Sequence, residues 1–236
     1  MGKKGQDKRT KTWNMSKVVN TSRKETAWTI TPKPGPHTKE TSVALGIVIR
    51  NYTKIVKTMN EAKKILTNGE VKVNGVIRKE YQFPVGLFDV ISIPKQKLFY
   101  RMIFDEKGRL VLATIENEPK IKISKVIKKV MTKKGLQLTT NDSRTFIGVK
   151  ANVGDALKIT LPEGKVSEVI EFKEGNLAYI TKGAHCSQTA KIVALVKGTE
   201  RKEELVKLQK GKEEFETILK NVYIIGKDKA EVEVLN

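Results

Sequence analysis

The apolar residues after position 42 first follow a helical period. Between residues 43 and 56 they recur about every 3.6 residues, which predicts a helix with Ser42 as its N-cap. A second helix is predicted over residues 61–66, with Asn60 as its cap. Gly69 stands just beyond this helix, where a glycine accepts the positive φ that ends many helices. The pattern therefore predicts two consecutive helices.

The period of the apolar residues then changes to two. Residues 71–73 and 76–77 alternate as strands do, and Asn74 and Gly75 between them are typical of a type I′ hairpin turn. A further strand is predicted through residues 89–93. The two helices, the hairpin and this strand together predict a small α+β domain.

Residues 95–172 combine β-branched residues with turn signals, which predicts antiparallel strands. The least regular part, residues 120–134, holds seven lysines among apolar residues, and its β-branched content favours a strand over a basic helix. The predicted fold class is therefore α+β and predominantly β. The other strands predicted in this region are residues 98–104, 109–115, 156–161 and 166–172.

The N-terminal part of the chain is basic and extended. Residues 1–20 carry too few apolar side chains for a core of their own, which predicts an arm that orders on a partner. Residues 28–37 contain three prolines, and each keeps itself and its predecessor out of the helical region, so we expect a rigid lead-in. We find no secretory signal and no apolar run that could span a membrane, and we expect a cytoplasmic protein.

The charge narrows the class of partner. The chain has 46 Lys and Arg residues against 26 Asp and Glu residues, which gives a net charge of +20 at pH 7. The excess lies in the first 170 residues, and the basic residues are spread over extended sequence rather than along one amphipathic helix. This distribution favours nucleic acid over a membrane surface. An ordinary basic domain without a polyanionic partner is the alternative.

Residues that could bind metals or act as nucleophiles are scarce. Cys186 is the single cysteine, so no intramolecular disulfide can form. Together with His37 and His185 it gives three ligands, fewer than the four of a structural zinc site. Adjacent residues such as His185 and Cys186 rarely align for catalysis, and neither a P-loop nor a dinucleotide fingerprint occurs. We expect no catalytic residue, no metal and no cofactor.

The segment from Leu45 to Ile93 carries a recognisable set of residues. It resembles the S-four-type RNA-binding domain, which is shared by ribosomal proteins, pseudouridine synthases and tyrosyl-tRNA synthetases. A helix and a hairpin that both carry basic residues would form a concave positive surface for structured RNA; the alternative is a merely solvated face. The matching residues are Arg50, Asn51, Glu61, Ala62, Gly69, Val71, Val73, Asn74, Gly75, Pro84, Val85, Gly86, Asp89 and Ile91.

A second short match lies in the C-terminal part. Residues 175–183 and 190–193 resemble the KOW motif of SH3-like barrels, in which glycine turns bring the backbone close to RNA. Ser187 and Ala190 stand where that motif usually has glycine. The loop is therefore either an RNA contact or an ordinary barrel loop with solvated side chains.

The order of these features over the whole chain is similar to that of the S-four-e family of small-subunit ribosomal proteins, most of all to its archaeal form. The resemblance implies a structural component without enzymatic activity. Its implied partners are small-subunit ribosomal RNA and neighbouring ribosomal proteins, with no membrane and no small-molecule substrate. It also implies a β-hairpin within residues 203–220, turned at residues 210–212, although leucines there follow a helical spacing.

These inferences divide the chain into four segments and define a set of contact residues. Residues 1–42 are a basic extension, 43–94 the RNA-binding domain, 95–172 a central antiparallel β domain, and 173–236 a KOW-type, SH3-like β-barrel. The candidate RNA-binding residues are Arg9, Lys11, His37, Arg50, Lys63, Lys64, Asn68, Lys72, Asn74, Arg78, Lys79, Lys182 and Lys191.

Two other functions use the same RNA-binding module. One is a non-ribosomal RNA-binding protein, and the other is an RNA-modifying enzyme similar to pseudouridine synthases. Such enzymes carry a catalytic aspartate after an Arg-Leu pair, whereas Arg109 and Leu110 precede Val111 here. The expected nucleophile is therefore missing.

Overall fold

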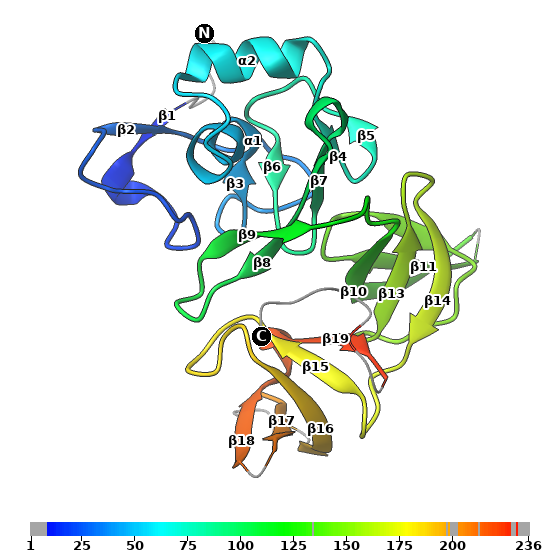
Figure 1. Cartoon of the computed structure of the whole chain (residues 1–236). Coiled ribbons are helices and arrows are strands. Elements are labelled where there is room, and N and C mark those ends of the chain that lie inside the picture. Colours follow the sequence, from blue (N-terminus) through cyan, green and yellow to red (C-terminus); the bar gives the residue numbers. More distant parts are fainter. Residues whose placement is uncertain are drawn as a thin grey trace, which may run out of the picture. The chain divides into compact units, whose positions relative to one another are not determined.

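The computed structural model describes residues 9–133, 135–196, 198, 203–211, 213–227 and 230. It divides into two compact units, one of Met1–Met102 with Arg109–Glu118 and one of Ile103–Gly108 with Pro119–Asn236. Strands predominate and helices are short (Figure 1), which confirms the predicted fold class. None of the helices in the described part has the length and apolar character that crossing a membrane requires.

The N-terminal segment packs on the first unit. Strand β1 (Arg9–Lys11) pairs antiparallel with β2 (Trp28–Ile30), and a 3₁₀ turn, η1 (Thr12–Asn14), follows β1. Met15 and Val19 are buried, and Val19 forms a parallel bridge with Leu110. The prediction of an arm without a core of its own is therefore wrong for residues 9–20, because these two apolar side chains anchor it. Residues 1–8 lie outside the described residues.

The predicted helix over residues 43–56 is wrong in its bounds. The segment begins as a strand, β3 (Val43–Ala44), which pairs with β6 (Pro84–Val85), and only then forms α1 (Leu45–Ile47) and a π-helical turn, η2 (Val48–Tyr52). Ser42 does not cap it, because its hydroxyl donates to the carbonyl of Thr38, 2.7 Å away. Pairing with a distant strand thus overrides the local helical period.

The second helix, α2 (Met59–Thr67), confirms the predicted element but not its cap. Thr58 is the N-cap: its hydroxyl accepts from the backbone N–H of Glu61, whose carboxylate accepts from the N–H of Thr58. This reciprocal capping box places the N-cap two residues before the predicted cap, Asn60. Gly69 has a φ of 75° and ends the helical segment as expected.

The hairpin after α2 confirms its prediction and opens an antiparallel sheet. Asn74 and Gly75 have φ values of 53° and 78°, as a type I′ turn requires. The sheet has the order β5-β4-β7-β8-β9. Its strands are β4 (Lys72–Val73), β5 (Val76–Ile77), β7 (Val90–Ile93), β8 (Leu98–Phe104) and β9 (Leu110–Ile115), with a 3₁₀ turn, η3 (Pro94–Gln96), between β7 and β8.

A second sheet has the order β12-β11-β10-β13-β14. Its long strand β10 confirms the strand predicted over the lysine-rich residues 120–134. The sheets divide the chain differently from the predicted segment 95–172, because β8 and β9 belong to the first sheet. The strands are β10 (Ile121–Thr132), β11 (Gly135–Thr140), β12 (Thr145–Ile147), β13 (Ala156–Thr160) and β14 (Lys165–Ile170), and their core is formed by Val126, Leu138, Ala151, Leu157 and Ile159.

The third sheet is curled and has the order β18-β17-β16-β15-β19 (Figure 1). It contains the hairpin predicted within residues 203–220, with Gly211 at a φ of 64° in its turn. Lys212, also assigned to that turn, lies outside the described residues. The elements are β15 (Leu177–Ile180), β16 (Thr189–Val196), β17 (Leu205–Lys210), β18 (Glu213–Ile218), the 3₁₀ turn η4 (Leu219–Asn221) and β19 (Val222–Gly226).

Two lysines of β10 point into the second unit. The ammonium group of Lys122 lies 3.0 Å from the carboxylate of Asp142, and both side chains are 1% exposed. The Lys125 ammonium instead donates to the carbonyls of Leu219 and Val222, 2.8 and 2.7 Å away. Burial lowers the pKa of Lys125 from 10.5 to about 8. The inward-facing residues of β10 therefore include cations as well as apolar groups.

We predict that Lys125 makes the stability of the protein depend on pH. Between about pH 8 and about pH 9.5 the unfolded chain keeps the Lys125 proton while the folded chain releases it, so stability rises with pH. Relative to Lys125→Met, the wild-type free energy of unfolding should increase by about 1.5 kcal/mol over this window. Urea unfolding of both proteins at the two pH values measures the difference. A constant difference between the two proteins would contradict the lowered pKa.

Candidate nucleic-acid interface

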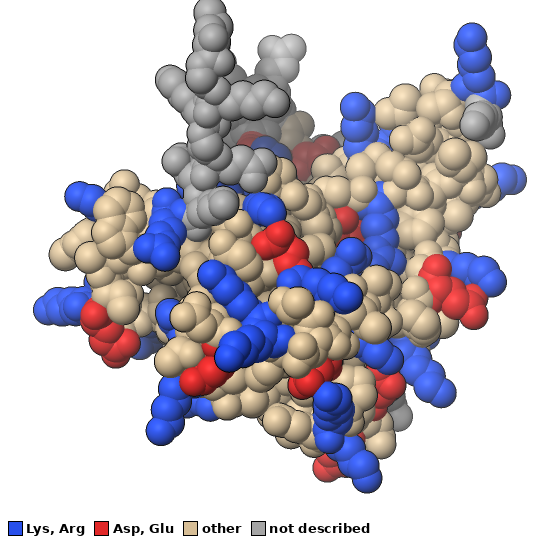
Figure 2. Space-filling model, turned by 90° about the horizontal axis from the view of Figure 1, so that it is seen from above, with Lys and Arg blue, Asp and Glu red and all other residues tan. Residues whose placement is uncertain are grey.

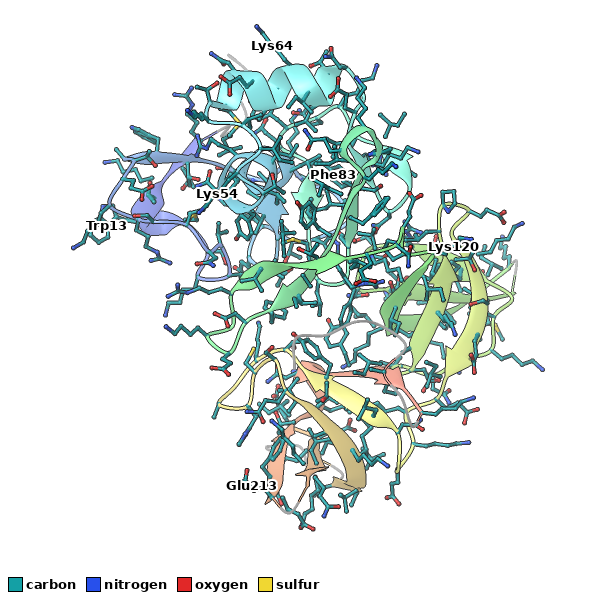
Figure 3. The ribbon with its side chains drawn as sticks, in the orientation of Figure 1. Trp13, Lys54, Lys64, Phe83, Lys120 and Glu213 are labelled. Atoms are coloured by element: carbon teal, nitrogen blue, oxygen red, sulfur yellow. The ribbon has the colours of Figure 1, made fainter. Side chains whose placement is uncertain are left out.

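Helix α2 carries two lysines whose charges lie at the surface. Ala62 and Leu66 are fully buried, whereas Lys64 is exposed and points away from the helix (Figure 3). Lys63 is half-buried, and its ammonium lies 4.5 Å from the centre of the Tyr81 ring. This cation–π contact holds the Lys63 charge at the surface beside α2.

The hairpin after α2 contributes three more cations. Lys79 is exposed and Lys72 is half-buried. The guanidinium carbon of Arg78 lies 4.6 Å from the centre of the Phe83 ring, which supports its planar group from one side. Phe83 therefore positions a cation on the surface formed by α2 and β4–β5. Asn68, another predicted contact, is exposed at the C-cap of α2.

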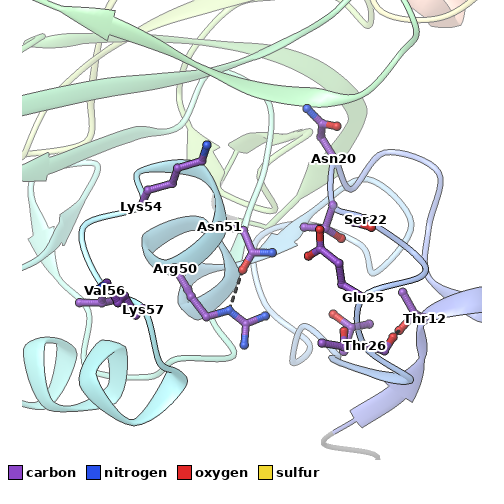
Figure 4. Close-up of a pocket in the computed structure, with 12 residues that line it drawn as sticks. Thr12, Asn20, Ser22, Glu25, Thr26, Arg50, Asn51, Lys54, Val56 and Lys57 are labelled. Atoms are coloured by element: carbon purple, nitrogen blue, oxygen red, sulfur yellow. Dashed lines mark hydrogen bonds between the residues drawn. The ribbon is translucent and has the colours of Figure 1, made fainter.

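A pocket of about 730 Å³ lies between the N-terminal segment and the turn that follows η2. Its two walls come from residues 12–29 and 50–57 (Figure 4). The second wall brings the cations of Arg50, Lys54 and Lys57 together, and Glu25 is the one acidic residue of the lining. The Nε of Arg50 donates to the side-chain oxygen of Asn51, 2.7 Å away, which fixes the plane of the guanidinium. Hydroxyl, amide and cationic groups in one pocket suit a phosphate–sugar segment.

The sequence predicts Arg50 as a contact residue, but the predicted set does not include Lys54 and Lys57, which line the same pocket. These lysines lie in an irregular connection, where Lys54 has a left-handed φ of 55°. Their place in the pocket depends on packing against residues 12–29, which are distant in sequence. Their charge was the only signal in the sequence that could have indicated them.

Two predicted contact residues, His37 and Asn74, are buried instead. Both bond to the buried carboxylate of Asp89: the Nε2 of His37 lies 2.8 Å from one oxygen, and the Nδ2 of Asn74 donates to the other at 2.8 Å. The N–H of Gly86 also donates to this carboxylate at 2.8 Å. A Cβ on Gly86 would lie 2.5 Å from the His37 ring, so only glycine fits there. His37 and Asn74 therefore position the hairpin and leave the proposed contact set.

Lysines on α2 and the hairpin lack the ion pairs that several lysines of the second unit form. In the part of the chain that the structure describes, Lys54, Lys63, Lys64, Lys72 and Lys79 form no ion pair. In the second unit many surface lysines lie beside glutamates, for example Lys207 with Glu216, Lys220 with Glu203 and Lys227 with Glu168. Basic side chains are spread across the face seen in Figure 2, with acidic ones among them. The lysines of α2 and the hairpin therefore differ from these three paired lysines.

The glycine-poor loop of the third sheet keeps the backbone of a glycine turn. Ser187 has a φ of 70°, so it takes the conformation for which glycine is normally used. Its neighbour Cys186 is buried, and its thiol donates to the carbonyl of Thr181, 3.2 Å away. The predicted contacts Lys182 and Lys191 are exposed. The KOW assignment and the RNA contact of this loop stay predictions.

The side chains of this loop show no catalytic arrangement. The His185 ring stacks on Phe215 with centroids 4.0 Å apart, and burial raises the pKa of the Cys186 thiol. A thiol with a raised pKa is a poor nucleophile at neutral pH. Among the described residues, no group of three or more His, Cys, Asp or Glu side chains is placed to hold a metal ion.

Helices η2 and α2, the β4–β5 hairpin and the unpaired lysines define an RNA-binding module of the S4 type, and the S4 domain family matches residues 51–91. The family described as Ribosomal family S4e matches residues 96–166. The small ribosomal subunit protein eS4 of Methanococcus vannielii is 39% identical over 217 residues, covering 87% of this chain and 88% of its own length. The chain therefore belongs to the ribosomal S4e family.

Further comparisons agree over nearly the whole length. The small ribosomal subunit protein eS4 of Thermoplasma acidophilum is 39% identical over 225 residues, which cover 94% of each chain. The crystal structure of the 30S ribosomal protein S4e from the same organism matches with a TM-score of 0.69 and 40% identity. That match covers 79% of this chain and 95% of the crystallised chain. These findings confirm the family resemblance drawn from the sequence.

We predict that Asp89→Ala strongly destabilises the first unit. The substitution leaves three buried donors without their acceptor, and each such group costs about 1–3 kcal/mol, so a loss of at least ~3 kcal/mol is expected. Urea unfolding measures this loss. The exposed Glu106→Ala is the matched control and should change stability by less than ~0.5 kcal/mol. Equal losses for both variants would contradict the role of Asp89.

Proposed function

We propose that the chain is a structural component of the small ribosomal subunit that binds ribosomal RNA in the cytoplasm and contacts neighbouring ribosomal proteins. The observation that carries this proposal is the similarity, at 39% identity over most of both chains, to proteins named as small ribosomal subunit protein eS4. An S4 domain with unpaired lysines supports the RNA-binding part. The role proposed is that of a scaffold without enzymatic activity or cofactor.

The physical basis of binding is neutralisation of phosphates. Lysines that form no ion pair lose no intramolecular partner when they meet a phosphate, so their full charge is available. The hairpin cations lie on an element that Asp89 holds through Asn74, which keeps these cations in a fixed arrangement. A fixed arrangement of cations favours structured RNA over an arbitrary polyanion.

The RNA-modifying alternative gains no support from the described residues. Val111, at the place where such an enzyme would carry its aspartate, is a half-buried residue within β9. Both relatives named above are described as ribosomal proteins rather than as enzymes.

Sedimentation of an archaeal lysate tests the proposal directly. We expect an epitope-tagged copy of this chain to co-sediment with the small subunit in a sucrose gradient, in a fixed ratio to other subunit proteins. It should remain there after a high-salt wash, because packing against RNA and neighbouring proteins retains an integral component even when salt weakens its phosphate contacts. Recovery at the top of the gradient, or in substoichiometric amounts, would contradict the proposal.

We predict that the lysines on α2 and the hairpin dominate the salt dependence of binding to small-subunit RNA. In the triple variant Lys63→Ala, Lys64→Ala, Lys79→Ala, the slope of log affinity against log salt should become shallower by roughly 2–3. Filter binding at several salt concentrations gives this slope.

The control is Lys207→Ala, Lys220→Ala, Lys227→Ala, which removes the same charge from lysines that already pair with glutamates. Its slope should stay close to that of the wild type. If the two triple variants changed the slope equally, net charge rather than the S4 surface would explain binding.

A further inference from the structure

The chain has two tryptophans, and both are exposed on the N-terminal ribbon formed by β1, η1 and β2. Trp13 is 72% exposed and Trp28 is 54% exposed. Figure 3 shows Trp13 directed away from the rest of the unit. Tryptophan carries the largest apolar surface of any side chain and is well buried on average, so two exposed tryptophans on one short ribbon indicate a binding surface.

The pairing of the ribbon places cations beside this aromatic surface. Lys11 lies opposite Trp28, and the Lys11 ammonium is 5.8 Å from the centre of its ring. Arg9 lies two residues before Lys11 and therefore on the same face of β1. Thr29, which points to the other face, is buried. One face of the ribbon therefore combines Arg9, Lys11 and Trp28, while the other packs against the protein.

The ribbon is held in place at its turn. The backbone N–H of Thr12 donates to the carbonyl of Ala27, 3.1 Å away, and its hydroxyl donates to the carbonyl of Thr26. Met15 is buried immediately after η1. Trp13 therefore lies between two anchored residues, and its backbone is fixed before any partner binds. An aromatic ring on a fixed backbone loses little conformational entropy when another ring stacks on it.

We propose that Trp13 and Trp28 stack on unpaired bases of a single-stranded RNA segment, while Arg9 and Lys11 contact its phosphates. Bases in a duplex stack on each other, whereas the faces of unpaired bases are free to stack on aromatic side chains. The inference rests on the proposed function and extends it, because it names the kind of RNA that this part of the chain binds.

The composition of the ribbon favours RNA over an apolar protein surface. Residues 9–30 carry five Lys or Arg residues and one acidic residue. The central part of a protein–protein interface is depleted of charged residues, whereas strands of nucleic acid are bound by aromatic side chains set among cations. The charge around the two rings therefore complements a phosphate backbone.

Tryptophan fluorescence tests the proposal on the full-length protein. Since Trp13 and Trp28 are the two tryptophans of the chain, their emission reports on this surface alone. A short single-stranded oligoadenylate should quench the emission, and a blunt RNA duplex of equal length should quench it much less. Trp13→Ala and Trp28→Ala should each weaken oligoadenylate binding about ten-fold, while the corresponding Phe variants should stay within about three-fold of wild type.

Two exposed apolar residues of the second unit supply the matched controls. Met131 is 79% exposed and Ile147 is 52% exposed, so Met131→Ala and Ile147→Ala remove comparable exposed groups outside the ribbon. Neither should change oligoadenylate binding. Circular dichroism of each variant shows whether its fold is intact, and the Phe variants test stacking without loss of the ring.

Three results would overturn the proposal: absent quenching, unchanged affinity in both Trp→Ala variants, or an equal loss on duplex and single strand. In the second case, if the Lys63, Lys64, Lys79 triple variant still weakened binding to small-subunit RNA, the proposed function would stand and only stacking would fail. If that triple variant also had no effect, the proposed RNA-binding surface would fail as well.

A protein partner for the ribbon is a different outcome. In that case the Trp→Ala variants would bind the small subunit more weakly, while their binding to oligoadenylate would not change.

Discussion

The arrangement of the first unit depends on the hydrogen bonds to the buried carboxylate of Asp89. Asp89 lies just before β7, and its carboxylate joins the lead-in through His37, the hairpin turn through Asn74 and the nearby turn at Gly86. A buried carboxylate is unfavourable unless donors surround it, so the donors must all be in place together. The orientation of the basic hairpin is thus a consequence of a polar contact in the interior.

Lysines in different parts of the chain have different partners. The lysines of α2 and the hairpin form no ion pair within the described residues, whereas Lys207, Lys220 and Lys227 pair with glutamates on the protein's own surface. Two lysines of β10 are buried, Lys122 against Asp142 and Lys125 against backbone carbonyls. Net charge therefore predicts a polyanionic partner, but only the pairing of each lysine shows which surface is free to meet it.

Local signals in the sequence predicted those elements whose cause is local. The Asn74-Gly75 turn follows from two residues that accept a positive φ, and the alternation of β-branched residues predicted β10 despite its lysines. Local sequence patterns gave wrong predictions where contacts with distant segments determine the structure. Val43 pairs with Val85 rather than beginning a helix, Met15 and Val19 anchor the supposed arm, and the pocket forms only when residues 12–29 meet residues 50–57. No local signal shows that His37 and Asn74 are buried, because their partner, Asp89, is far away in the chain.

The capping box of α2 has a consequence for how its surface can change. Glu61 is the acidic residue nearest in sequence to Lys63 and Lys64, yet its carboxylate accepts from the backbone N–H groups of Lys57 and Thr58, which lowers its pKa. The start of the helix is therefore stabilised without any contribution from the lysine charges. Substitutions that exchange these cations, or move them along the helix, leave its start intact. The start of the helix and the charge on its surface are therefore set by separate residues, Thr58 and Glu61 for the first and the two lysines for the second.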